Sequence, residues 1–87
     1  MMVIDKQSIG DLLVLDVLAD LHKVKRKLAY FTGKYGMNLE RFETQVNAEG
    51  ESFERYDDLI EWKGFQAAYR EAVERIEELQ HGRFQIA

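Results

Sequence analysis

Apolar residues recur along this chain at alternating spacings of three and four, which is the pattern of one face of an α-helix. The first apolar stripe consists of Val14, Val17, Leu21, Val24, Leu28 and Phe31, and the second of Trp62, Phe65, Tyr69, Ala72, Ile76 and Leu79. A period near 3.5 residues is typical of a helix that packs lengthwise against another helix. The pattern therefore predicts two long helices, each with one packing seam.

Residues that favour helix ends mark the expected boundaries. Ser8 can cap the first helix, and Asp11 follows three residues later in the manner of a capping box. Gly36 can adopt the left-handed conformation that ends a helix, while Asn38 and Ser52 are suitable N-caps for two further helices. We expect helices over about 8–35, 39–46 and 53–80, a polar loop over 47–51 and a helix end at Gly82.

These elements predict an all-α fold in one domain over residues 1–87, with two long antiparallel helices joined through a short one. The absence of proline favours uninterrupted helices, each ~40 Å long at ~1.5 Å per residue. In this hairpin, residues 14–21 should face 69–79, and residues 24–31 should face 53–65. The short apolar ends, 1–4 and 83–87, are compatible with frayed termini or with small strands.

The first helix carries more apolar surface than one seam uses. Leu12, Leu13, Leu15 and Leu18 widen its stripe in the N-terminal half. Because a hairpin buries about one stripe per helix, apolar surface should stay exposed in an isolated chain. We therefore expect either a homodimer that closes a four-helix bundle, resembling a coiled coil, with these leucines at the interface, or a heteromer in which a partner covers this surface. An 87-residue chain has a small core and would gain stability from such association.

Charge is distributed unevenly between the two halves of the chain. Residues 1–37 carry six basic and four acidic side chains, whereas residues 38–87 carry six basic and twelve acidic ones, giving local net charges of +2 and −6. An acidic C-terminal half favours association with a basic partner. The chain has no cysteine and no apolar run near the ~18 residues that a membrane span needs, so we expect a cytoplasmic protein without a signal peptide.

No arrangement of residues points to catalysis. Ser8 and Ser52 are better explained as helix caps than as nucleophiles, so we expect no enzyme activity. Glu78 and His81 have the Glu-x-x-His spacing of helical di-iron sites, but His22, the other histidine, has Ala19 at the matching position. The sequence therefore predicts neither a metal nor a cofactor.

A basic run in the first helix is a second candidate feature. It contains His22, Lys23, Lys25, Arg26 and Lys27, and such a run could bind phosphates of a nucleic acid or an acidic membrane surface. The interleaved apolar stripe and the acidity of the whole chain argue against both. A solvated face that pairs with the acidic start of the third helix is the favoured interpretation.

The segment 51–63 combines carboxylates with aromatic rings. Its candidate partner-binding residues are Glu54, Tyr56, Asp57, Asp58, Glu61 and Trp62. Rings beside carboxylates make good interface anchors for a basic partner. The alternative is that the rings belong to the core and the acids stabilise the N-terminal end of the helix. The sequence leaves both interpretations open.

Several short motifs resemble those of a known group of proteins. They are Lys34-Tyr35-Gly36-Met37, Phe42-Glu43, Phe53-Glu54, Tyr56-Asp57-Asp58 and Glu61-Trp62-Lys63. Across residues 20–80 the chain resembles small helical antitoxins of prokaryotic toxin–antitoxin modules. The resemblance implies neutralisation of a small toxin, which the acidic block would engage if that toxin is basic. The alternative is a homo-oligomeric helical structural protein without a toxin partner.

Overall fold

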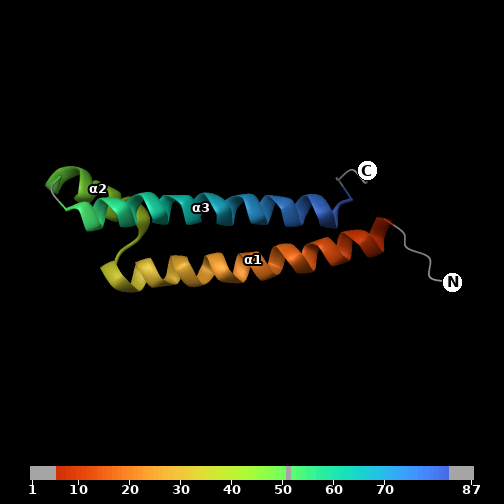
Figure 1. The fold of residues 1–87 in the computed structure, drawn as a ribbon. Helices are drawn as coiled ribbons and strands as arrows, with labels where there is room; N and C mark the ends of the chain where they lie inside the picture. The colour runs from red at the N-terminus through yellow and green to blue at the C-terminus, as the bar shows by residue number, and fades with distance from the viewer. Residues whose placement is uncertain (1–5, 51, 83–87) are drawn as a thin grey trace.

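The computed structural model describes residues 6–50 and 52–82 and consists there of helices only, which confirms the all-α prediction. The helices are α1 (Lys6–Tyr35), α2 (Leu39–Glu49) and α3 (Phe53–Gln80). α1 and α3 lie antiparallel along their length, and α2 lies against the first part of α3 at the closed end of the hairpin (Figure 1). The terminal segments 1–4 and 83–87 lie outside the described residues. None of the described helices is long and apolar enough to cross a membrane.

The two predicted stripes form the seam between α1 and α3. Every residue of both stripes is buried or half-buried. Phe31 packs against the ring of Trp62, and Val24 lines the same groove as Ala68 and Ala72. Val24 thus lies further along α3 than the expected range 53–65. The difference follows from the register of the hairpin, because Lys34 at the end of α1 contacts Glu54 and Asp58 and Phe31 packs on Trp62, which places Val24 beside later residues of α3.

The main core lies where all three helices meet. Its buried residues are Phe31, Phe42, Val46, Leu59 and Trp62, all exposed by 5% or less. The Trp62 ring centroid lies 5.6 Å from that of Phe31 and 5.4 Å from that of Phe42. Phe42 and Val46 are four residues apart, so they share one face of α2 and both reach this cluster. Outside this cluster the buried hydrophobic residues are Leu21, at the middle of α1, and Leu79, near the end of α3.

The predicted caps between the helices are confirmed. The Asn38 side chain accepts a hydrogen bond from the Arg41 backbone N–H at 2.9 Å, and Ser52 accepts one from the Arg55 N–H at 3.2 Å. Gly36 has a φ of +66°, and its N–H donates to the Thr32 carbonyl at 2.8 Å. This left-handed glycine closes α1 and lets the chain turn into α2.

Two predicted helix ends are wrong. α1 includes Lys6 and Gln7, so Ser8 lies within the helix and not at its N-cap position. α2 continues to Glu49 through most of the expected loop. It ends at Gly50, whose φ of +68° allows its N–H to donate to the Val46 carbonyl at 2.9 Å.

Replacing the core tryptophan tests the three-helix cluster. Trp62→Ala should lower the free energy of unfolding by ~3–5 kcal/mol, because the ring leaves a cavity among packed aromatic side chains. Urea denaturation followed by circular dichroism measures this loss. Tyr56→Ala is the matched control, since Tyr56 is 55% exposed, and its effect should stay within ~0.5 kcal/mol. Equal losses in both variants would contradict the assignment of Trp62 to the core.

Candidate protein-binding surfaces

Large apolar side chains remain exposed on both long helices, as the sequence predicts for an isolated chain. They are Leu12, Leu15 and Tyr30 on α1 and Phe53, Tyr56 and Ile60 on α3, with exposures between 55% and 90%. Because a soluble single chain rarely exposes such side chains in groups, each group is a candidate contact surface.

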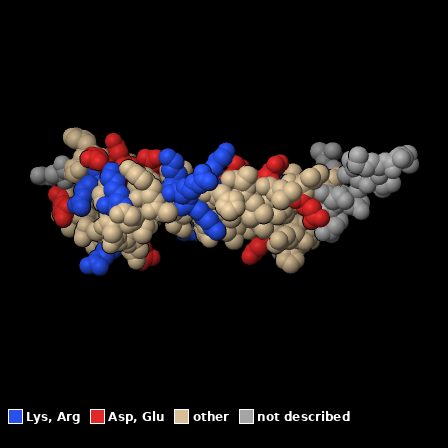
Figure 2. All heavy atoms as spheres, turned by 90° about the horizontal axis from the view of Figure 1, so that it is seen from below, with Lys and Arg blue, Asp and Glu red and all other residues tan. Residues whose placement is uncertain are grey.

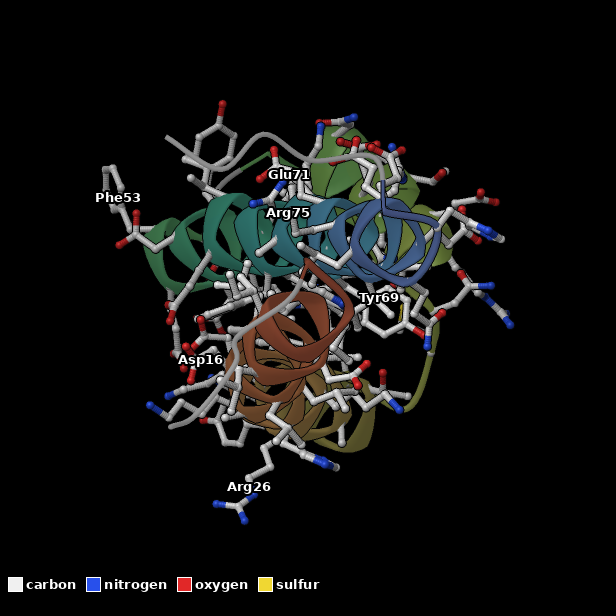
Figure 3. The ribbon with its side chains drawn as sticks, turned by 90° about the vertical axis from the view of Figure 1, so that its right-hand side faces the viewer. Asp16, Arg26, Phe53, Tyr69, Glu71 and Arg75 are labelled. Atoms are coloured by element: carbon white, nitrogen blue, oxygen red, sulfur yellow. The ribbon has the colours of Figure 1, made fainter. Side chains whose placement is uncertain are left out.

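The first candidate, called the α3 surface here, consists of Phe53, Tyr56 and Ile60 with the carboxylates of Asp57 and Glu61. The three apolar residues are spaced by three and four, so they share one face of α3. Phe53 is 90% exposed and projects away from α1 and α2 (Figure 3). Asp57 and Glu61 are exposed on the adjacent strip of the same helix. The α3 surface therefore offers apolar area and negative charge together.

The structure divides the six predicted partner-binding residues. Glu54, Tyr56, Asp57 and Glu61 are exposed. Trp62 is only 2% exposed and belongs to the core, so its ring is not a surface anchor in this structure. Asp58 is engaged within the chain, as described below. Phe53 and Ile60 were not among the predicted site residues. Their spacing of three and four from Tyr56 could have indicated one shared helix face, different from the face of Leu59 and Trp62.

Asp58 belongs to a polar cluster that joins the end of α1 to the start of α3. Lys34 Nζ lies 2.8 Å from Asp58 Oδ2 and 2.9 Å from Glu54 Oε1. The Tyr35 hydroxyl donates a hydrogen bond to the same Asp58 oxygen. The first helix thus does pair with the acidic start of the third, but through Lys34 and not through the basic run that was expected to do so. Within residues 6–50 and 52–82, no ion pair involves the basic run 23–27, so that part of the expectation is wrong.

The cluster shifts the ionisation of its members. Burial alone would raise the pKa of the Asp58 carboxyl, but the hydrogen bonds from Lys34 and Tyr35 outweigh it and hold that pKa below its usual value. Burial, together with the hydrogen bond to Asp58, raises the pKa of Tyr35. Hydrogen bonds to Asp58 and then Glu54 raise the pKa of Lys34. At neutral pH the cluster therefore holds an ammonium, a carboxylate and a neutral phenol in fixed geometry.

Two basic residues of α3 are paired with carboxylates of α2. Arg55 Nη1 lies 2.6 Å from Glu49 Oε2, and its guanidinium lies 5.7 Å from the ring centroid of Tyr35. Lys63 Nζ lies 2.5 Å from Glu43 Oε2. In the described part of the chain no ion pair involves Asp57 or Glu61, so their charge is presented to solvent.

The second candidate lies on α1. Of the four leucines predicted at an oligomer interface, Leu12 and Leu15 are each 63% exposed, whereas Leu13 and Leu18 are half-buried. Lys and Arg side chains gather near the middle of this face, beside an area with little charge toward the N-terminal end of α1 (Figure 2). Of the predicted interface residues, only Leu12 and Leu15 are therefore largely exposed, and they lie on the N-terminal side of the basic segment.

A shallow groove of about 440 Å³ runs between α1 and α3. Val17, Val24, Ala68 and Ala72 line it, together with Asp20, Glu71 and Arg75. The small Ala68 and Ala72 side chains leave this side of the seam open, whereas Tyr69 lies on the other side (Figure 3). Among the described residues, no three His, Asp or Glu side chains gather closely enough to hold a metal ion.

Comparison of the chain with models of protein families, with curated proteins and with solved structures finds no match. The functional argument therefore depends on the two exposed surfaces. Both are open, convex helix faces, and their residue types suit contact with another polypeptide.

Replacing Asp58 tests the polar cluster through the pH dependence of stability. Because the folded pKa of Asp58 is lowered, its charge stabilises the fold above its unfolded pKa of about 3.9, and that contribution is lost as pH falls through the folded pKa. Asp58→Asn should therefore lower stability at pH 7 and flatten its decline between about pH 5 and pH 2. Urea denaturation at several pH values measures both effects.

The control is Asp57→Asn, which removes the same charge from the neighbouring exposed position. This variant should decline with pH as steeply as the parent protein. If the stability of Asp58→Asn declined with falling pH as steeply as that of the parent protein, the cluster would not stabilise the fold.

Proposed function

We propose that this protein is a protein-interaction module that binds a small basic protein through the α3 surface and neutralises it in the manner of an antitoxin. The observation that carries the proposal is the exposure of Phe53, Tyr56 and Ile60 on one helix face beside Asp57 and Glu61. Exposed rings and aliphatic side chains supply contact area, and the carboxylates favour a basic partner.

The polar cluster supports this role by fixing the start of α3. Lys34 and Tyr35 hold Asp58 from the end of α1, while Arg55 contacts Glu49 of α2. Binding to a surface that is already ordered costs less conformational entropy than binding to a flexible segment. The α3 surface is therefore suited to tight binding although it is small.

Charge adds selectivity for the partner. The C-terminal half of the chain carries a net charge of −6, and the carboxylates of Asp57 and Glu61 lie next to the apolar stripe. Such a field accelerates encounter with a basic protein and disfavours an acidic one. The resemblance to helical antitoxins supports a toxin as that partner, with its active surface covered in the complex.

The experiment is recovery of the tagged protein from its source organism at moderate salt, followed by mass spectrometry and light scattering. We expect one small basic protein at fixed stoichiometry, which inhibits growth when produced alone and does not when this chain is produced with it. Phe53→Ala with Ile60→Ala should weaken that complex by at least ~30-fold, because the two apolar anchors should together contribute ~2 kcal/mol or more.

The matched control for this experiment is Leu12→Ala with Leu15→Ala, which removes similar exposed area from α1. Its affinity for the basic protein should equal that of the parent. Retained affinity and growth rescue in the Phe53, Ile60 double variant would show that the α3 surface is not the binding site. Recovery of this chain without a companion would contradict the antitoxin role.

The second candidate function is a homo-oligomeric helical protein, and the exposed leucines of α1 favour it. Leu12 and Leu15 are each 63% exposed on a helix whose opposite side already packs against α3. Pairing with a second copy would cover them and close a four-helix assembly. This candidate is compatible with the first, because it uses a different face of the molecule.

Light scattering tests self-association. The parent protein should have about twice the 10.2 kDa mass of one chain at micromolar concentration, and Leu12→Asp should shift it to a monomer because a carboxylate would be buried against apolar side chains. Ile60→Asp is the control, since Ile60 is 59% exposed on the other surface, and it should remain a dimer. A parent protein that stays monomeric up to high concentration would rule out the homodimer.

A further inference from the structure

A second stripe with helical spacing runs along α1 on the side away from α3. It consists of Leu12, Leu15, Ala19, His22, Arg26, Tyr30 and Gly33, all of them exposed. The spacings of three and four match those of the buried seam, so a second helix can follow this outer stripe over its whole length. The outer stripe is apolar at its N-terminal end, small at Ala19 and basic beyond His22.

The charges beside the outer stripe change sign along α1. The charged residues from position 11 to 20 are acidic, and those from position 23 to 27 are basic. All seven are exposed: Asp11, Asp16, Asp20, Lys23, Lys25, Arg26 and Lys27. Figure 2 shows the basic segment at the middle of this face and separate carboxylates toward the N-terminal end of α1. α1 therefore has an acidic half and a basic half on its exposed side.

We propose that α1 pairs with α1 of a second copy in antiparallel orientation, with the two-fold axis passing between Ala19 and His22. The inference rests on the homodimer proposed above and specifies its geometry. An antiparallel pair places the acidic half of each helix beside the basic half of the other, and symmetry makes every such contact occur twice. A parallel pair would instead place Arg26 beside Arg26 and Lys23 beside Lys23, which repel.

The axis position follows from matching the residues. With the axis between Ala19 and His22, Arg26 of each copy lies opposite Leu15 of the other and next to its Asp16, and Leu12 of each copy lies near Tyr30 of the other. The Arg26 side chain projects from α1 away from α3, and Asp16 lies at the side of α1 (Figure 3). Ala19, next to the axis, allows the two helices to approach closely, since the distance between packed helices is set by the side chains at the crossing.

This pairing leaves the α3 surface uncovered. The outer stripe faces away from α3, and the α3 surface lies at the closed end of the hairpin beside α2 (Figure 1). A dimer formed through α1 would therefore present two α3 surfaces and bind two molecules of a basic partner.

Engineered cysteines test the orientation directly, because the chain has no cysteine of its own. Ala19→Cys and Gly33→Cys both introduce a thiol at an exposed position of the outer stripe, and a side chain at Gly33 meets nothing within 4 Å. In the antiparallel dimer the two thiols of the Ala19→Cys variant are offset by only ~4.5 Å along the helices, whereas those of the Gly33→Cys variant are ~38 Å apart.

A short bis-maleimide should therefore link nearly all of the Ala19→Cys dimer and none of the Gly33→Cys dimer on a denaturing gel. A parallel dimer would link both variants. Linking of Gly33→Cys, or a dimer in which Ala19→Cys is not linked, would overturn the antiparallel arrangement and leave the homodimer itself standing. A parent protein that is monomeric by light scattering would overturn both.

Charge reversal gives an independent test of the same contact. Arg26→Glu and Asp16→Arg should each weaken the dimer by about tenfold, because each places like charges together twice. The variant with both changes exchanges the two charges and should bind itself within about threefold of the parent. If the losses of dimer affinity in the two single variants add up in the double variant, Asp16 and Arg26 are not in contact across the dimer. Affinity for a basic partner at the α3 surface should be unaffected by either change.

Discussion

The packing of Phe31 and Phe42 on Trp62 is the interaction on which the rest of the structure depends. It is the place where one aromatic ring from each helix is buried, with the Phe42 and Phe31 centroids 5.4 and 5.6 Å from that of Trp62. Elsewhere α1 and α3 share only a narrow seam, as expected for two helices without a third layer. The cluster therefore fixes both the position of α2 and the register of the hairpin at its closed end.

The polar cluster of Lys34, Tyr35 and Asp58 is built on this aromatic core. The Tyr35 ring stacks on Phe42 with a centroid distance of 4.1 Å, and that contact aims its hydroxyl at Asp58. Asp58 is thereby held by two donors from the end of α1, while the apolar face of the same helical turn points outward. The start of α3 therefore packs against the core with one side and exposes the α3 surface on the other, so a change in the core packing would also move that surface.

Two long helices cannot bury all of their apolar surface against each other. Each helix offers the hairpin one stripe, and the second stripe of each remains exposed: Phe53, Tyr56 and Ile60 on α3, and Leu12 and Leu15 on α1. The exposed leucines of α1 and the exposed residues of α3 lie on different helices and different faces. The two partners proposed above, a basic protein and a second copy of the chain, would therefore use different surfaces.

The sequence by itself determined the helices, their seams and most of their ends. These features depend on local spacing and on single residues such as Gly36, Asn38 and Ser52, whose effects act within one turn. Tertiary structure decided which apolar residues are buried at the start of α3, because Leu59 alternates along the helix with Tyr56 and Ile60, and both sets are comparably apolar. Phe42 and Val46 of α2 cover the first set and leave the second exposed, so the choice was made by a contact between residues far apart in the chain.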